Sequence, residues 1–169
     1  MSRRMKLFAL VAMLALSARA DAGEWQVQPA DGSHGTVLTL ALGPAVTYRF
    51  ECAATEVIVT ETGVTKLMDM KTGEKIGDDA QAEMPPGSAI MALFAGKGDP
   101  RFMPAEAKRN PAGGWDLTIR LPKGDERLEA IGKSDAMSLF TTGITILVKL
   151  DDTSRSRWKD FMKHCPAGA

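Results

Sequence analysis

The sequence predicts an all-β fold, an antiparallel β-sandwich or barrel of about eight to nine short strands with one C-terminal α-helix at 153–165. Three observations predict this class. Apolar and polar residues alternate with period two in several segments, turn-forming residues separate those segments, and no long amphipathic helix lies between them. The last observation argues against a parallel α/β sheet, because the strands of such a sheet are joined by helices.

The chain begins with a pattern typical of a signal peptide (1–20). A basic stretch precedes an uninterrupted apolar run at 7–16, and small residues follow that suit cleavage before Asp21 or Gly23, the first being preferred. The apolar run is too short to cross a bilayer, which takes about 20 apolar residues. We therefore expect an exported domain of residues 21–169, periplasmic or secreted, with no stable membrane insertion after cleavage.

The charge of that domain limits the partners it can have. Residues 1–20 contain four of the 21 basic residues and no acidic residue, so 17 basic and 21 acidic residues remain, a net charge of −4. Nucleic-acid binding needs a basic surface that displaces counterions, and attachment to an anionic membrane needs a basic cluster. The sequence supplies neither, so we expect no nucleic-acid partner. The remaining 149 residues have the usual size of one domain.

The clearest strands are VTYRFEC (46–52) and WDLTIRL (115–121), in which every second residue is apolar. Segments 38–42 and 144–150 show the same alternation, which is typical of strands with one buried face. The residues expected to face the core are Leu38, Leu40, Leu42, Val46, Tyr48, Phe50, Cys52, Trp115, Leu117, Ile119, Leu121, Ile144, Ile146, Val148 and Leu150. Less regular β-rich segments lie at 56–61, 65–70, 88–95, 127–131 and 136–141.

The hydrophobic period changes near the C-terminus. Apolar residues there recur at helical spacing and form one narrow stripe, made up of Trp158, Phe161, Met162 and Cys165. We expect an N-cap at Asp152 or Thr153 and an end at Pro166, which cannot continue a helix.

Cys52 and Cys165 are the only two cysteines, and both lie on faces expected to point inward. Export would place them in an oxidising compartment, where disulfides form and persist. We predict a Cys52–Cys165 disulfide that ties the terminal helix to the sheet and contributes about 4 to 5 kcal/mol in the chain-entropy model. Adjacent helical residues point about 100° apart, so His164 is expected to face solvent.

No motif in the sequence predicts catalysis. The segment DGSHG (31–35) joins an acid, a hydroxyl and an imidazole, but its residues are typical of a turn, and the members of a catalytic triad converge from separate elements. Adjacent carboxylates diverge in an extended chain and suit turns or helix caps; the three such pairs are Asp78-Asp79, Asp125-Glu126 and Asp151-Asp152. We expect no enzyme activity, no catalytic residue and no cofactor.

The methionines allow an alternative to a plain core role. Thioether sulfur is a soft ligand that selects Cu(I). Met68 and Met70 would project from one side of a strand, where Met84, Met91 or a histidine would complete a site. We favour the competing interpretation that both fill an irregular core, as methionine does well, and expect no metal.

The segment 96–114 interrupts the strand pattern for 19 residues. Loops of this length in compact domains are usually functional or locally structured, and residues 104–109 suit one or two helical turns. We predict a partner-binding loop with an apolar anchor and a cationic rim; its candidate residues are Arg101, Phe102, Met103, Lys108 and Arg109. The alternative is that Phe102 and Met103 only pack the loop onto the sandwich.

These observations favour an exported binding or accessory module that contacts an envelope protein or a small ligand. A periplasmic Cu(I)-handling protein and an inhibitor of a cell-wall hydrolase are the alternatives. The stretch YRFEC (48–52) is similar to the opening strand of the membrane-bound lysozyme inhibitors, which are small disulfide-tied β-barrels. The serine-glycine-x-x-tyrosine stretch that such inhibitors use against the enzyme is absent from this chain, so the resemblance implies no role for any residue.

Overall fold

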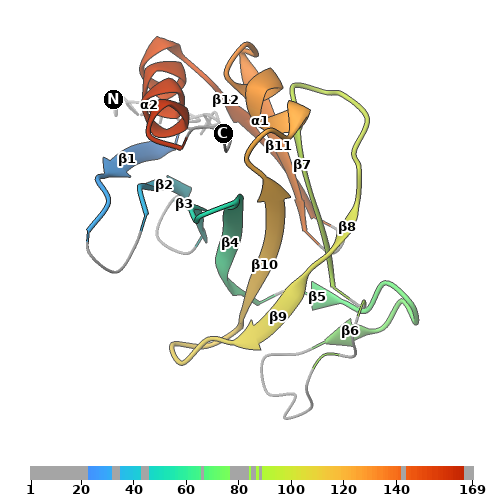
Figure 1. Ribbon diagram of the computed structural model, residues 1–169. Coiled ribbons are helices and arrows are strands. Elements are labelled where there is room, and N and C mark those ends of the chain that lie inside the picture. Colours follow the sequence, from blue (N-terminus) through green and yellow to red (C-terminus); the bar gives the residue numbers. More distant parts are fainter. Residues whose placement is uncertain are drawn as a thin grey trace, which may run out of the picture.

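The computed structural model describes residues 23–31, 35–42, 46–65, 67–76, 84, 87, 89–141 and 144–165. Two antiparallel sheets form a sandwich, with a short hairpin at one end and two helices at the other (Figure 1). The predicted all-β sandwich with a C-terminal helix is confirmed. The described residues form twelve strands, more than the eight or nine expected, because several are too short or too polar to stand out in the sequence.

The larger sheet has six strands in the order β1-β2-β3-β4-β10-β9. They are β1 (Glu24–Gln28), β2 (Val37–Leu42), β3 (Val46–Cys52), β4 (Glu56–Val64), β10 (Trp115–Pro122) and β9 (Glu106–Arg109). The smaller sheet has four strands in the order β12-β11-β7-β8. They are β12 (Ile144–Lys149), β11 (Ala136–Thr141), β7 (Ile90–Ala95) and β8 (Met103–Pro104). The hairpin pairs β5 (Leu67–Met68) with β6 (Lys75–Ile76).

The core lies between the sheets and consists of buried apolar side chains from both. In β10 the buried and half-buried positions alternate along most of the strand, as the sequence pattern predicts. The predicted inward residues that are buried are Leu38, Leu40, Tyr48, Phe50, Cys52, Trp115, Leu117, Ile119, Leu121, Val148 and Leu150. Leu42 and Ile146 are only partly buried. The side chains of Val46 and Ile144 lie outside the described set.

The terminal helix α2 (Asp152–Lys163) packs on β1 and β2. Its buried stripe matches the prediction, with Trp158 and Phe161 inside the core. The predicted N-cap is wrong by one or two residues, because the carboxylate of Asp151 accepts from the amide of Ser154 at 2.8 Å. That amide lowers the pKa of Asp151. The helix ends at Lys163, and Pro166 lies outside the described residues.

A second helix, α1 (Glu126–Ile131), replaces the strand predicted at 127–131, so that prediction is wrong. The carboxylate of Asp125 caps it by accepting from the amide of Arg127 at 3.0 Å. Leu128 and Ile131 are buried at helical spacing, three residues apart. The pair Asp125-Glu126 thus lies at a helix start, as expected for adjacent carboxylates.

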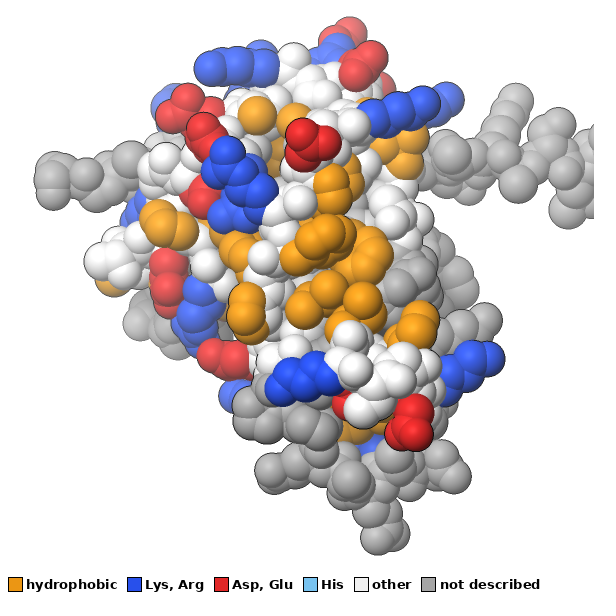
Figure 2. Space-filling view, turned by 90° about the vertical axis from the view of Figure 1, so that its right-hand side faces the viewer, with side chains coloured by type: hydrophobic (Ala, Val, Ile, Leu, Met, Phe, Trp, Pro, Cys, Tyr) orange, Lys and Arg blue, Asp and Glu red, His pale blue; other side chains and the backbone are white. Residues whose placement is uncertain are grey.

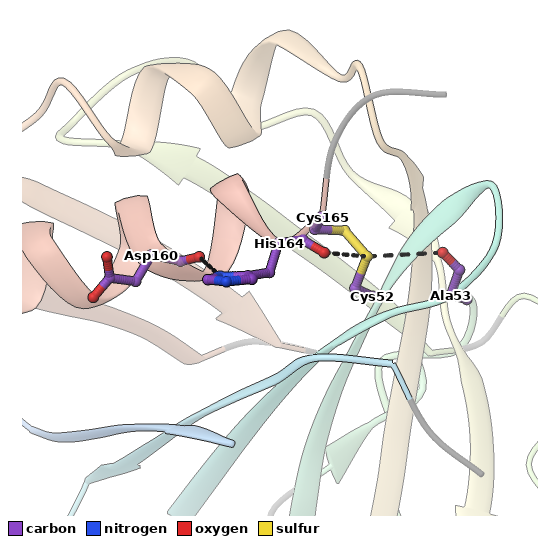
Figure 3. The surroundings of a disulfide bond; sticks show 5 residues. All are labelled: Cys52, Ala53, Asp160, His164 and Cys165. Carbon is purple, nitrogen blue, oxygen red and sulfur yellow. Dashed lines mark hydrogen bonds between the residues drawn. A yellow bond between two sulfur atoms is a disulfide. The ribbon is translucent and has the colours of Figure 1, made fainter. Parts of the chain in front are cut away.

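The Cys52–Cys165 disulfide is present and joins β3 to the end of α2 (Figure 3). The two Cα atoms are 5.5 Å apart, within the usual range for a disulfide. His164 is exposed, as predicted, and its Nδ1 atom lies 2.8 Å from the carbonyl oxygen of Asp160. The helix end is therefore held covalently, and the histidine faces away from the sulfurs.

Some predictions fall on parts of the chain outside the described residues. The expected signal peptide and the central residues of the DGSHG turn, 32–34, are among them, as is the pair Asp78-Asp79. Among the residues that are described, no helix combines the length and the apolar character needed to cross a membrane.

Candidate functional site

The segment 96–114 is not a loop with helical turns, and that prediction is wrong. Residues 103–104 pair with β7 as β8, and residues 106–109 pair with β10 as β9. The chain passes from the smaller sheet to the larger one at Ala105, whose amide donates to the carbonyl of Ala89 at 2.9 Å. The chain does not form a helix here, because Ala105 and Ala107 alternate with polar residues and give the period of a strand.

The five predicted contact residues are consequently divided between two sheets. Arg101 forms an ion pair with Glu126 at 2.6 Å, and both side chains are mostly exposed. Met103 turns inward, with its sulfur 3.3 Å from a guanidinium nitrogen of Arg127. Phe102 turns outward and is 51 % exposed.

Lys108 and Arg109 lie on β9, at the edge of the other sheet. The guanidinium carbon of Arg109 lies 4.0 Å from the ring centroid of Trp115, a cation–π contact with a buried side chain. Arg109 therefore packs against its own domain. The structure brings Arg101, Phe102 and Met103 together and separates them from this pair.

Phe102 belongs to a larger surface, which we call the apolar face. Met91 and Leu93 of β7 point into the core, so their neighbours point out to the other side of the sheet. The apolar residues on this outer side are Ile90, Ala92, Phe94, Phe102, Phe140 and Leu147. Figure 2 shows hydrophobic side chains gathered over the middle of this side of the molecule, with charged side chains around them.

The apolar face is exposed chiefly at Phe102 and Leu147, whereas its Ala92 is buried. The rings of Phe102 and Phe140 meet edge to face with centroids 4.9 Å apart, and Leu147 is 42 % exposed. Ser138 lies on the same side but is buried, and its hydroxyl donates to the carbonyl of Gly96 at 2.6 Å. Contiguous exposed apolar side chains on a sheet are unfavourable in water and mark interaction sites.

The sequence could have indicated this surface only in part. Phe94 and Phe140 were placed in β-rich segments, but their outward direction follows from the register with β7 and β11. Phe140 faces Ala92 directly across the strands, and this small residue leaves room for the ring. Sequence alternation alone does not reveal a sheet that is apolar on both sides.

Met68 and Met70 do not project from one side of a strand, as the copper hypothesis required. β5 ends at Met68, and Met70 follows in a turn that the Asp69 amide closes by donating to the carbonyl of Glu74 at 2.8 Å. Met70 is 41 % exposed, so the prediction that it fills the core is also wrong. Met91 is buried in β7. In the described ranges, no three His, Cys, Asp or Glu side chains form a group that could hold a metal ion.

The described surface has hollows at the helices and beside the sheet edges. One, of about 280 Å³, lies between α1 and α2 over Trp158 and Met162, with Glu129, Lys133 and Lys159 also lining it. Another, of about 260 Å³, lies beside β8 and β9 and is lined largely by apolar residues, among them Ala89, Ala105 and Ala107. Both are at or below the low end of small-molecule sites, which are about 300–1,000 Å³.

A buried polar cluster connects the two sheets. Glu61 of β4 is 5 % exposed, and its carboxyl group accepts a short hydrogen bond from the hydroxyl of Thr141 at the end of β11. Tyr48 faces Glu61 across β3 and β4. Burial raises the pKa of Glu61, and burial together with the nearby Glu61 charge raises the pKa of Tyr48. These groups are sealed from solvent, so they act on stability rather than on a substrate.

We expect Glu61→Gln to change the pH dependence of stability. The unfolded carboxyl ionises near the usual value of 4.5, whereas the folded one stays protonated to higher pH. Its contribution to stability is therefore complete below about pH 4.5 and is lost as the pH rises through the folded pKa. Glutamine keeps an acceptor for Thr141 and has no charge to bury, so the variant should gain on wild type as the pH rises. Chemical denaturation across about pH 4 to 8, a range that starts near the usual carboxyl pKa, measures this difference in stability.

The matched control is Glu74→Gln, which changes an exposed carboxyl group. It should follow the wild-type curve at every pH. If Glu61→Gln also runs parallel to wild type over the whole range, then the carboxyl group does not ionise differently in the folded protein.

No protein-family model, curated protein or solved structure matches this chain in the three comparisons made.

Proposed function

We propose that this protein is an exported, non-enzymatic binding module that docks on another envelope protein through its apolar face. The observation that carries the proposal is the exposure of Phe102, whose ring packs against Phe140 on the outward-facing side of the smaller sheet. Aromatic side chains held on a rigid sheet are frequent anchors of protein interfaces, because they bury much area at little cost in side-chain entropy.

A protein partner fits this surface better than a small ligand. Small-molecule sites are concave and enclose most of the ligand, whereas the apolar face is the open outer side of a sheet. The ion pair of Arg101 with Glu126 and the charge of Lys149 supply the polar rim that protein interfaces have around an apolar centre.

Capture from an envelope extract tests the proposal. Immobilised wild-type protein should retain a distinct partner, and Phe102→Ala should reduce its recovery by about tenfold or more, as loss of an interface anchor does. Met70→Ala is the matched control, since Met70 is also an exposed apolar residue, at 41 % against 51 % for Phe102, but lies on the turn after β5.

Arg109→Ala separates this proposal from the contact loop predicted from the sequence. Arg109 lies on the edge of the larger sheet, so its replacement should leave recovery unchanged. Equal recovery by wild type and Phe102→Ala would overturn the proposal, and loss of the partner with Arg109→Ala would point to the β9 edge.

A further inference from the structure

The two sheets leave four outermost strands, β1, β9, β8 and β12. Three of them carry features that protect an edge from pairing with another chain. β9 has the sequence EAKR with three charged residues, and β8 has two residues, one of them Pro104. β1 begins with Glu24, and α2 packs against it.

β12 has less of this protection, because its one charged residue, Lys149, stands at its C-terminal end. Its sequence is ITILVK, with no charge before Lys149 and no proline. It pairs with β11 on one side. Among the described elements no other strand pairs with it. A six-residue edge strand with a single charge at its end is a template for pairing with a further strand.

The residues that present this free edge follow from the register. The amide of Leu150 donates to the carbonyl of Asp135 at 2.8 Å, so this facing pair is hydrogen-bonded. Bonded and non-bonded pairs alternate along antiparallel strands, so Ile146 and Val148 also direct their backbone groups to β11. Thr145, Leu147 and Lys149 direct theirs outward.

We propose that β12 pairs antiparallel with β12 of a second copy of this chain, about a two-fold axis at Leu147. One register uses all three outward-facing residues of both strands. It places Leu147 opposite Leu147 of the second copy and Thr145 opposite Lys149 of the second copy. The backbone edge is thus self-complementary, which an isologous two-fold contact requires.

The charges favour the same register. Lys149 is the one charged residue of β12, and a register centred on it would place two ammonium groups face to face, which is unfavourable. With Leu147 on the axis, each Lys149 faces an uncharged threonine. The two lysines are then about 14 Å apart along the strands, at about 3.4 Å per residue.

The pairing also places the apolar faces of the two copies side by side. Leu147 is 42 % exposed on that face, and it would be covered by its symmetry equivalent. The result is one continuous eight-stranded sheet made from two four-stranded sheets. This self-association goes beyond the proposed function, and either can fail without the other.

Cysteine cross-linking of the purified protein tests the register. Facing Cα atoms in a bonded antiparallel pair are about 5.5 Å apart, within the range of a disulfide. Leu147→Cys should therefore form a covalent dimer under mild oxidation. Thr145→Cys and Lys149→Cys should each stay monomeric alone and give a dimer when mixed. Ser156→Cys, exposed on α2, is the control and should give none.

Sedimentation across a concentration series tests the energetics. Wild type should show reversible dimers, and Leu147→Lys should raise the dimer dissociation constant by about tenfold or more, because it sets two like charges on the axis. Phe102→Ala should leave the dimer intact, which separates this result from partner capture. A wild type that stays monomeric throughout, or Leu147→Cys that cross-links no more than Ser156→Cys, would overturn the proposal.

Discussion

Removal of the Cys52–Cys165 disulfide should lower the free energy of unfolding by about 4 to 5 kcal/mol. The bridge spans 113 residues, so breaking it releases a long loop in the unfolded chain and raises the entropy of that state. It also frees the end of α2, which carries Trp158 and Phe161 into the core. Denaturant unfolding of oxidised and reduced wild-type protein, followed by tryptophan fluorescence, measures the difference.

The variant with Cys52→Ala and Cys165→Ala controls for the reductant. It should unfold at the same denaturant concentration with and without reductant, close to reduced wild type. If oxidised and reduced wild type unfold together, then the bridge does not constrain the unfolded chain, and the packing of α2 alone holds the helix.

Trp158→Ala should cost about 3 to 5 kcal/mol, as the truncation of a large buried aromatic does. The ring of Trp158 is 1 % exposed and lies edge to face with Phe50 at 5.2 Å between centroids. Its Nε1 donates to the carbonyl of Leu128 at 3.0 Å, so truncation also leaves a buried acceptor unpaired. Denaturant unfolding followed by circular dichroism is the measurement.

Trp158→Phe is the matched variant, because it keeps much of the apolar volume and loses the hydrogen bond. It should cost about 1 to 3 kcal/mol, the penalty for an unpaired buried acceptor. A Cβ on Gly132 would lie 3.2 Å from the Trp158 ring, so this glycine lets α1 approach the indole. A cost for Trp158→Ala no greater than that for Trp158→Phe would contradict this role of the ring.

Both effects concern features that the sequence predicts well. A strand with one buried face repeats its apolar residues every second position, which is why β3 and β10 were found with the right face inward. The stripe of α2 repeats at helical spacing for the same reason. With two cysteines on inward faces, one pairing was possible, and the structure contains it.

The errors have physical reasons too. In α1, the spacing of three between Leu128 and Ile131 fits a helix and not one face of a strand, and the cap by Asp125 was a second sign that a helix begins there. β1 was missed although Trp25 and Val27 alternate with polar residues, because it follows the expected cleavage site closely. β9 was missed because its one partly buried residue is Ala107, and an alanine gives a weak apolar signal.

The apolar face could not be predicted from the sequence, because it depends on which strands pair with each other. Phe102 was found as an aromatic residue beside arginine, but its neighbours Phe94 and Phe140 come from strands that pair only in the folded sheet. The buried cluster of Glu61 with Thr141 joins residues 80 positions apart. Pairing between distant strands decides both, so the sequence could supply the members but not the arrangement.

The docking role proposed for the apolar face is tested most directly by site-specific photo-cross-linking in intact cells. A photoreactive residue at Phe102 should give one discrete adduct with a protein other than this chain, and the same residue at Met70, which is comparably exposed, should give none. Identical patterns from both positions, or no adduct from Phe102, would contradict the assignment of the apolar face as the docking surface.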